Sequence, residues 1–186
     1  KKKSYGENFF CLDKLLPEEI TIKIYNLLLN MDSLYWRKNY SFREQKKNFF
    51  KLEKVDSLIL NITEAFHDTK VIKKIEEITS IDNLEADPSL YAGGISMMNK
   101  NDFLNPHIDN SHDAKKKRYR RLNLLFYVSP NWDRLSGGNL ELWNEKVNNN
   151  ITITSKFNRL VVMKTNRLSW HSVNKIEINK PRFCIS

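Results

Sequence analysis

The sequence lacks several features that would point to particular classes of protein. No apolar run approaches the roughly 18 residues that a membrane-spanning helix needs, and the longest, at 27–29 and 160–163, are short. The basic start at 1–3 is followed by no apolar segment, so a signal peptide is not expected there. Two cysteines, Cys11 and Cys184, are too few for a disulfide framework or a zinc site. These absences predict a reduced, soluble protein of the cytoplasm.

Glycine is also scarce, with five in 186 residues, and none belongs to a glycine-rich phosphate loop. Helical and strand patterns do not alternate along the chain, and no internal repeat is present. A doubly wound nucleotide-binding fold is therefore not expected. The length suits one domain, and a hydrophobic fraction of 40% is enough to build a core.

The first ninety residues have the pattern of helices. Apolar residues recur at spacings of three and four, which is typical of an amphipathic helix. The clearest stripe consists of Ile20, Ile24, Leu27, Leu28 and Met31. The same spacing predicts helices over 41–50 and 55–66, and a further helix that Asp68 caps. This half is expected to pack against the rest of the chain.

From Gly93 onward, apolar residues come in short runs or alternate, separated by turn formers such as Gly137-Gly138. Strands are predicted over 94–98, 106–109, 122–128, 139–143, 151–154, 159–164, 171–173 and 183–186. Strands of this number and length indicate a sandwich or barrel. The expected organisation is one α+β domain over 1–186, with mainly helical support in 1–90 and a β core in 91–186.

His107 and Asp109 are candidate metal ligands, because residues two apart on a strand point to the same face. His171, 62 residues beyond Asp109 (171 − 109), is the best candidate for a third ligand. Two histidines and one carboxylate on one face of a cation leave positions open, as in non-haem Fe(II) oxygenases. The alternative is a local hydrogen-bonded pair beside an unrelated His171. His67 and His112 are expected to be surface or loop residues.

Arg182 follows His171 by 11 residues (182 − 171), where the next strand is expected. A guanidinium is a planar fork that holds a carboxylate through two charge-assisted hydrogen bonds. By itself, Arg182 is as well explained by a surface salt bridge. Together with the three metal-ligand candidates, it is better interpreted as a clamp for the distal carboxylate of 2-oxoglutarate.

Several motifs occur in an order and spacing that fit one known family. They are 103–109 (FLNPHID), 121–128 (RLNLLFYV) with Trp132, 137–143 (GGNLELW), 157–162 (FNRLVV) and 169–171 (SWH). On these motifs, the segment 93–186 resembles the 2-oxoglutarate- and Fe(II)-dependent dioxygenases of the prolyl 4-hydroxylase type. The resemblance implies a double-stranded β-helix, or jelly roll, with supporting N-terminal helices. It also implies Fe(II), 2-oxoglutarate and O₂ as cofactor and co-substrates, with ascorbate as a stimulant.

The resemblance assigns roles to single residues. His107, Asp109 and His171 match the iron ligands, and Arg182 matches the residue that holds the distal carboxylate of the co-substrate. Tyr127 matches a strand tyrosine that hydrogen-bonds the same carboxylate.

The co-substrate site also shows departures from the family. Asn123 shares a strand face with the matched tyrosine and is expected to reach the co-substrate. Met97 stands where many relatives have a tyrosine, and it cannot donate a hydrogen bond. Cys184 stands where some relatives have a serine beside the arginine, and Ser186 on the same strand face is its expected substitute.

The carboxylate of Asp109 favours hydroxylation, because related halogenases have a small residue at that position. The implied reaction hydroxylates an unactivated C–H bond and releases succinate and CO₂, with a prolyl residue of a protein or peptide as the expected substrate. A small molecule such as an amino acid, a sugar or a nucleotide-sugar is the alternative substrate. A cupin-like metalloprotein would usually offer more histidine ligands and lack the Arg182 clamp. A basic, nucleic-acid-binding β module is the non-enzyme alternative.

The formal charge is +9, from 31 Lys+Arg and 22 Asp+Glu, and six of the seven residues at 115–121 are basic. Such a run is either a solvated loop or a patch that attracts anions. Because it follows the His107–Asp109 motif, it is expected near the mouth of the site and favours an anionic substrate. Neither nucleic acid nor a membrane is an expected partner.

Overall fold

The computed structural model describes residues 3–4, 8–91 and 93–186. Its helices are α1 (Glu18–Leu29), α2 (Ser57–Ala65) and α3 (Thr69–Thr79), with 3-10 turns η1 (Ser33–Tyr35) and η2 (Leu52–Lys54). Its first strands are β1 (Lys3–Ser4), β2 (Phe9–Asp13), β3 (Arg37–Tyr40), β4 (Glu44–Phe49), β5 (Ile95–Met98) and β6 (Phe103–His107). The later strands are β7 (Leu122–Tyr127), β8 (Leu140–Trp143), β9 (Asn150–Ile153), β10 (Arg159–Lys164), β11 (His171–Val173) and β12 (Arg182–Ile185). None of the described helices is long and apolar enough to cross a membrane.

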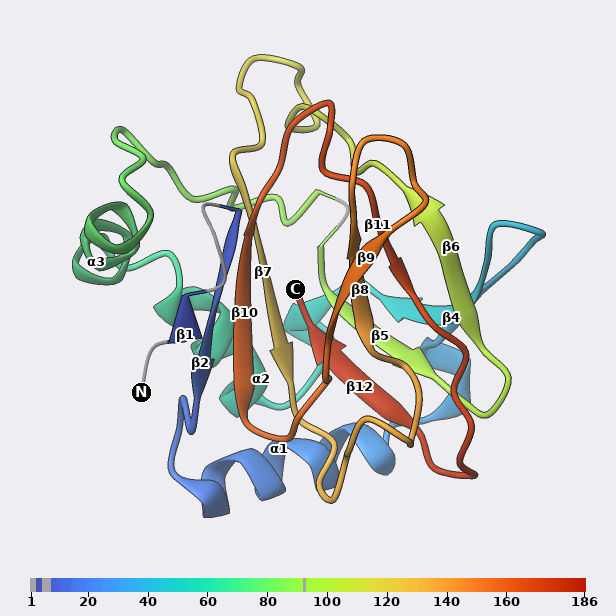
Figure 1. Ribbon diagram of the computed structural model, residues 1–186. Coiled ribbons are helices and arrows are strands. Elements are labelled where there is room, and N and C mark those ends of the chain that lie inside the picture. Colours follow the sequence, from blue (N-terminus) through green and yellow to red (C-terminus); the bar gives the residue numbers. More distant parts are fainter. Residues whose placement is uncertain (1–2, 5–7, 92) are drawn as a thin grey trace.

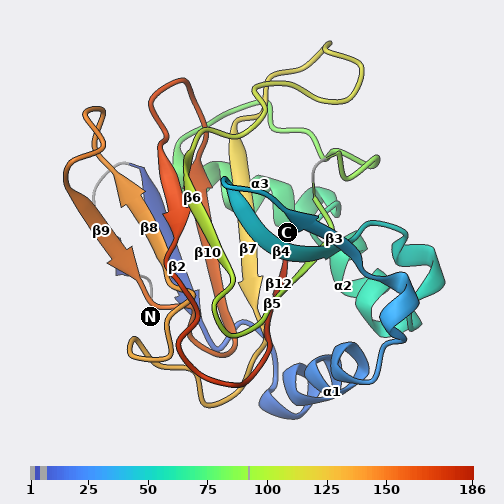
Figure 2. The same ribbon diagram turned by 90° about the vertical axis from the view of Figure 1, so that its right-hand side faces the viewer.

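The strands form one curled antiparallel sheet in the order β1-β2-β10-β7-β12-β5-β4-β6-β11-β8-β9, with β3 paired to β4. Figures 1 and 2 show the sheet wrapping round until β8 and β11 face β7 and β10 across a central interior. This is the double-stranded β-helix that the sequence predicts. The strands predicted from Ile95 onward lie within one or two residues of those observed, except β6, which begins at Phe103 and ends before Asp109.

The two faces of strand β12 border the interior of the barrel and the outer layer. It lies between β7 and β5, and Cys184 pairs with Tyr127 while Arg182 pairs with Met98. Because successive side chains on a strand alternate between faces, Arg182 and Cys184 point into the barrel and Phe183 and Ile185 point away from it.

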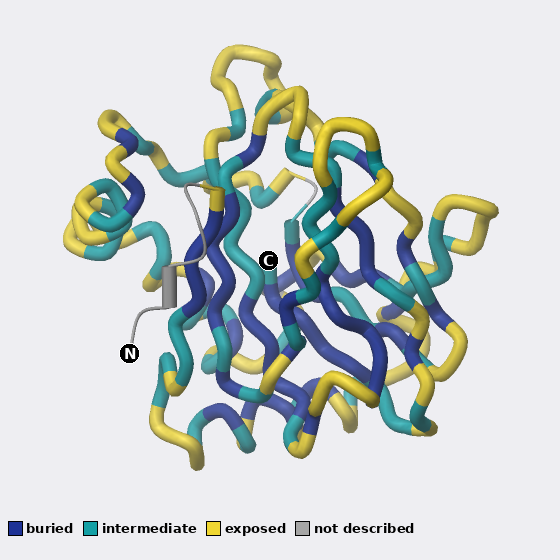
Figure 3. The backbone as a smooth tube through the Cα atoms, in the orientation of Figure 1, coloured by how far each residue is buried: buried dark blue, intermediate teal, exposed yellow. Residues whose placement is uncertain are grey.

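The outer face of the sheet packs against α1 and α2. Pro17 precedes α1 and two acidic residues occupy its first turn, where their carboxylates interact favourably with the positive end of the helix dipole. The buried face of α1 packs with side chains from η2, α2, the sheet and Trp36, which follows η1. This outer core includes Ile24, Leu28, Trp36, Phe49, Leu52, Ile59, Phe126, Leu160, Phe183 and Ile185. Figure 3 shows the exposed segments gathered in the loops around the buried strands.

A second cluster fills the interior of the barrel, formed by Phe9, Cys11, Tyr127, Leu140, Ile153, Val161, Met163 and Cys184. Strand β2 closes one side of it through its pairing with β10. At the end of that pairing, the guanidinium of Arg159 binds the Asp13 carboxylate by two hydrogen bonds of 2.5 and 2.9 Å. The N-terminal half therefore contributes to the barrel itself as well as to its outer support.

The helix predicted over 41–50 is wrong, since this segment belongs to the antiparallel hairpin of β3 and β4. Its sequence has few apolar residues before Phe49, and β4 bridges β5 and β6. Backbone pairing to two neighbouring strands outweighs a weak local preference for helix. The helices predicted over 55–66 and after Asp68 are present as α2 and α3, and Asp68 accepts a hydrogen bond from the Lys70 amide as its cap.

Candidate metal and co-substrate site

His107, Asp109 and His171 come together at one end of the barrel, where β6 ends and β11 begins (Figure 1). His107 and His171 are direct partners in the β6–β11 pairing, so their side chains share a face. One potential ligand atom from each of the three residues lies within 4.8 Å of the other two. The Nε2 atoms of His107 and His171 lie 3.5 and 3.6 Å from the two carboxylate oxygens of Asp109. Among the described residues, this is the one group of side chains that could hold a metal ion.

Both imidazoles are oriented by the backbone on their far side. Nδ1 of His107 lies 3.0 Å from the carbonyl oxygen of Asn105, and Nδ1 of His171 lies 3.0 Å from that of Ser169. A carbonyl only accepts, so Nδ1 carries the proton and Nε2 keeps its lone pair for a metal. Burial and the neighbouring His107 lower the pKa of His171, which favours this neutral form.

Asp109 is held as a carboxylate between these imidazoles. Burial opposes its ionisation, but the hydrogen bond from His107 and the charges that His171 and His107 carry when protonated outweigh that effect and lower the pKa of Asp109 well below its usual value. The side-chain amide of Asn123 donates a hydrogen bond of 2.9 Å to Asp109 Oδ2. Asn123 therefore contacts the metal-ligand candidate directly, a contact that the sequence did not predict.

Arg182 lies deeper in the barrel and is 3% exposed. Its Nε donates to the Ser155 hydroxyl at 3.2 Å, and its Nη1 lies 2.9 Å from the sulfur of Met98, a weak acceptor. No carboxylate of the described residues forms an ion pair with it. A buried charge without a counterion is costly, so the guanidinium is suited to receive an anion from outside the chain.

The backbone at Gly138 passes close to the side chain of Arg182, where the absence of a Cβ atom leaves room for it. Gly138 has a φ of +63°, and a Cβ atom there would lie 2.7 Å from Arg182 Cδ and 2.4 Å from Ile176 Cδ1. A side chain at this position would therefore displace the stem of Arg182. The Ser155 hydroxyl, which donates to the carbonyl of Gly138, completes this wall.

Tyr127 supplies a further polar group beside Arg182. Its ring centroid lies 5.0 Å from the guanidinium carbon, and its buried hydroxyl has no hydrogen-bond partner in the described part of the chain. Burial raises the pKa of Tyr127 to about 12, so the hydroxyl stays protonated and able to donate. Within the described chain, this buried hydroxyl has no hydrogen-bond partner and the guanidinium beside it has no carboxylate partner, so the two fit the carboxylate of a ligand such as 2-oxoglutarate.

Ser186 is the remaining predicted co-substrate residue, and Cys184 and Met97 are the two positions that depart from the family. The Ser186 hydroxyl is 3.4 Å from the carbonyl of Gly94, at the edge where β12 meets β5. Cys184 is buried in the barrel interior, and burial raises the pKa of its thiol to about 11. Met97 packs against the outer core, away from the barrel interior, because the inward positions of β5 are Ser96 and Met98.

Ser155 and Met98 were missed by the sequence reasoning, although both contact Arg182. Ser155 lies just after β9, and nothing in the local sequence separates it from other loop serines. For Met98, the inward alternation of β5 could have indicated its place once the register with β12 was known.

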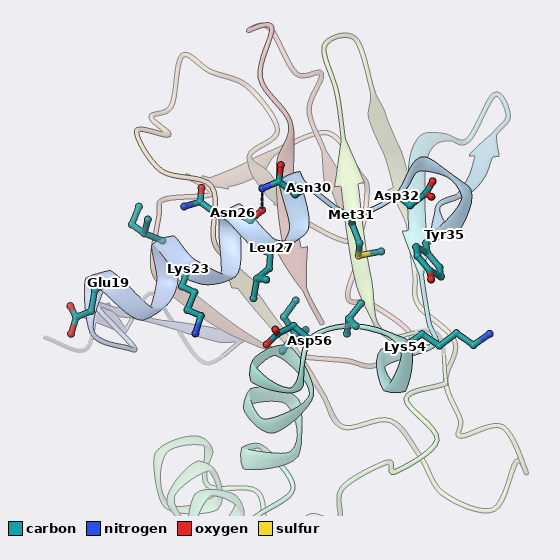
Figure 4. A pocket seen from close by; sticks show the side chains of 13 residues that line it. Glu19, Lys23, Asn26, Leu27, Asn30, Met31, Asp32, Tyr35, Lys54 and Asp56 are labelled. Atoms are coloured by element: carbon teal, nitrogen blue, oxygen red, sulfur yellow. Dashed lines mark hydrogen bonds between the residues drawn. The ribbon is translucent and has the colours of Figure 1, made fainter.

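A separate pocket of about 590 Å³ lies in the helical layer (Figure 4). It is bordered by α1, η1, η2 and the start of α2, and its rim carries Glu19, Lys23, Lys54 and Asp56. Neither histidine nor cysteine lines it. It is therefore distinct from the group of metal-ligand candidates in the barrel.

Solved structures of other proteins share this fold over nearly the whole length of the chain. A prolyl-4-hydroxylase from Pseudomonas putida matches with a TM-score of 0.69 at 12% identity, over 96% of this chain and 89% of its own. A Trichoplax adhaerens prolyl hydroxylase, in complex with a hypoxia inducible factor peptide fragment, matches with a TM-score of 0.67 at 16% identity, over 97% and 83%. HygX from Streptomyces hygroscopicus, with nickel and 2-oxoglutarate bound, matches with a TM-score of 0.61 at 11% identity, over 95% and 80%. No curated protein sequence matches the chain.

A jelly-roll barrel that gathers two histidines and an ionised aspartate at one end defines a non-haem iron oxygenase. The model of the 2OG-Fe(II) oxygenase superfamily matches residues 93–186, which is half of the chain. The protein belongs to this superfamily. Fe(II) is its metal and 2-oxoglutarate its co-substrate, and O₂ is implied by the family.

Proposed function

We propose that this oxygenase hydroxylates an unactivated C–H bond, and that its substrate is a prolyl residue in a peptide or protein. The observation that carries the reaction type is the pairing of two sites inside one barrel. One is the cluster of His107, Asp109 and His171, and the other is the buried guanidinium of Arg182, which lacks a carboxylate partner among the described residues.

In this proposal, His107, Asp109 and His171 bind the iron through one atom each. Arg182 and Tyr127 bind the distal carboxylate of 2-oxoglutarate, since both offer donors with no anionic partner of their own in the described chain. Bound together, the metal and the co-substrate supply the oxidising chemistry, with release of succinate and CO₂. The apolar interior around them keeps bulk water out of the site.

The substrate part of the proposal rests on the comparisons and on the mouth of the site. One similar fold binds a peptide, which supports a peptide substrate here. Another similar fold has been solved with hygromycin B bound, so a small molecule is the second candidate. Hydroxylation is favoured because Asp109 occupies the ligand position that is left to a halide in related halogenases.

An anionic substrate is favoured by a basic hairpin, residues 111–120, that connects β6 to β7 and rises at the metal end of the barrel (Figure 1). Its ends are joined by backbone hydrogen bonds from Asp113 to Arg118 and from Arg120 to Ser111. The Asp113 carboxylate accepts the amides of Lys117 and Arg118 at 2.7 and 3.1 Å. These hydrogen bonds fix the backbone of the turn that carries the exposed lysines 115–117.

The test is an anaerobic titration of metal-free protein with Fe(II) and then 2-oxoglutarate, following the visible charge-transfer band of the chelate. The wild-type protein should develop the band. His107→Ala should lose it through loss of metal, and Arg182→Ala should require far more 2-oxoglutarate. A wild-type protein that binds no Fe(II) would overturn the proposal. Tight, salt-sensitive nucleic-acid binding in its place would favour a basic binding module.

A positive titration leaves the substrate to be identified. Succinate release should then be measured with acidic proline-containing peptides, with the same peptides carrying alanine in place of proline, and with free amino acids. Hydroxylation of the proline peptides, found as a mass gain of one oxygen, supports the peptide proposal. Turnover with free amino acids in place of peptides contradicts it.

A further inference from the structure

Strand β4 carries two adjacent lysines that lie on opposite faces of the sheet. Asn48 pairs with Ser96, which pairs with Cys184 in the barrel interior, so Asn48 and Lys46 face inward. Lys47 shares its face with Phe49, which belongs to the outer core. The sequence singled out neither lysine, because the segment was expected to be a helix.

The pairing between strands β4, β5 and β12 places Lys46 close to Arg182. Lys47 pairs with Met97 and Asn48 with Ser96, so the same register places Lys46 opposite Met98. Met98 in turn pairs with Arg182 and touches its guanidinium. The two cationic side chains are therefore separated by a single strand on the inner face.

The charge of Lys46 also acts on a group beside Arg182 on the inner face of the sheet. Its ammonium acts to lower the pKa of the Cys184 thiol, against the larger effect of burial, which raises it. Cys184 follows Arg182 by two residues on β12 and shares its inward face. The ammonium is thus close to the inner face of β12, the strand that carries the guanidinium.

Lys46 is partly withdrawn from solvent, with 22% of its side chain exposed, and its one printed ion pair is with Glu44 at 2.9 Å. Glu44 lies two residues earlier on the same inward face. An ammonium has three donors, so this ion pair leaves donors that can serve another acceptor on the inner face of the sheet.

We propose that Lys46 is a further co-substrate-binding residue, whose ammonium donates a charge-assisted hydrogen bond to a carboxylate of 2-oxoglutarate inside the barrel. This inference rests on the proposed function of Arg182 and the metal cluster. Glu44 holds the ammonium on the inner face, and the bound dianion then lies between two cationic side chains. A hydrogen bond between charged groups in such a site is stronger than one between neutral groups.

The experiment compares Lys46→Met with Lys47→Met, which remove the same charge from the two faces of one strand. The Fe(II) protein is titrated with 2-oxoglutarate without O₂, and the dissociation constant is read from the charge-transfer band. Lys46→Met should weaken 2-oxoglutarate binding by about tenfold or more, with Fe(II) affinity unchanged. Lys47→Met should bind 2-oxoglutarate as the wild type does.

Equal 2-oxoglutarate affinity in Lys46→Met and the wild type would overturn the inference, even if turnover changed. Arg182→Ala distinguishes this result from failure of the proposed function. If Arg182 did not bind 2-oxoglutarate, Arg182→Ala would also bind it as the wild type does. Circular dichroism and thermal unfolding check that each variant is folded. Should Lys46→Met not fold, Lys46→Gln keeps a donor for Glu44 without the charge, and the same loss of affinity is expected of it.

Discussion

The amide nitrogen of Asn123 lies 2.9 Å from the Oδ2 atom of Asp109, the same oxygen that faces Nε2 of His171. Asn123 comes from β7 and Asp109 follows β6, so this contact crosses the barrel between segments that are separated by the basic hairpin. It fixes the rotation of the carboxylate from the side opposite His107. We therefore expect Asn123 to position the Asp109 carboxylate for the metal.

Replacing Asn123 with alanine should weaken metal binding while leaving the three ligand candidates in place. Loss of an outer hydrogen bond to a metal ligand typically costs about 10- to 100-fold in affinity. Titration with Co(II), followed by its visible absorption, measures this directly. Asn26→Ala, at an exposed position on α1, is the control and should bind as the wild type. Unchanged affinity in Asn123→Ala would show that Asp109 does not need the contact.

The close approach of Gly138 to Arg182 predicts a selective loss of 2-oxoglutarate affinity in Gly138→Ala. The added Cβ displaces the stem of the guanidinium. Gly137→Ala is the matched control, because its φ is +74° and its Cβ would meet the carbonyl oxygen of Lys175 without contacting Arg182. Both variants should unfold at lower temperature, since each forces a left-handed backbone on alanine. Similar 2-oxoglutarate affinities in the two folded variants would contradict the prediction.

The Asp13–Arg159 pair predicts a defined dependence of stability on pH. The hydrogen bond from Arg159 is the main cause that lowers the pKa of Asp13 below 3.8, against the opposing effect of burial. A group with a lowered pKa in the folded state stabilises it above the unfolded pKa, and loses that effect as pH falls through the folded pKa. Asp13→Asn should therefore reduce the free energy of unfolding by about 1 kcal/mol at pH 7.

Denaturant unfolding at several pH values measures this difference. The gap between the wild type and Asp13→Asn should begin to narrow near pH 4 and shrink further below it. A gap that stays constant from pH 7 to pH 2.5 would mean that the variant acts through packing and not through the charge.

The basic hairpin predicts a loss of substrate use without a loss of co-substrate turnover. Changing Lys115, Lys116 and Lys117 to glutamine removes three exposed charges at the metal end of the barrel. kcat/KM for an acidic peptide should fall by about tenfold at low salt and less at high salt, because screening already weakens the attraction. Uncoupled 2-oxoglutarate decarboxylation should stay unchanged.

The control for this prediction changes Lys70, Lys73 and Lys74 to glutamine, which removes the same charge from α3. The α3 variant should use the acidic peptide as the wild type does. Equal losses in both variants would point to net charge alone, and no loss in either would remove the hairpin from substrate binding.

The β half could be predicted closely, because its turns are marked by residues such as Gly137 and Asn148 and its strands alternate. The metal cluster was recognisable for a similar reason. His107 and Asp109 are neighbours in sequence, and a distal histidine followed by Arg182 completed a known chemical pattern. These features are local or depend on spacing, which a sequence shows directly.

What the sequence could not show depends on pairing between distant strands. The lysine-rich β4 is a strand because it joins β5 to β6, and its own residues carry little sign of that. The same holds for the Asn123–Asp109 contact and for the position of Ser155 against Arg182. Register decides which side of a strand faces inward, so the functional difference between Lys46 and Lys47 appears only once β4 is paired.

Strand β12 is inserted between β7 and β5, although the chain forms both of those strands earlier. During synthesis, the middle of the sheet therefore cannot be completed until β12, which is translated after β5 and β7, has been made. A nascent chain lacking β12 would expose the edges of β5 and β7 and would have a metal cluster without its guanidinium. The protein is thus expected to acquire its co-substrate site late in folding, in the same step that covers the edges of β5 and β7.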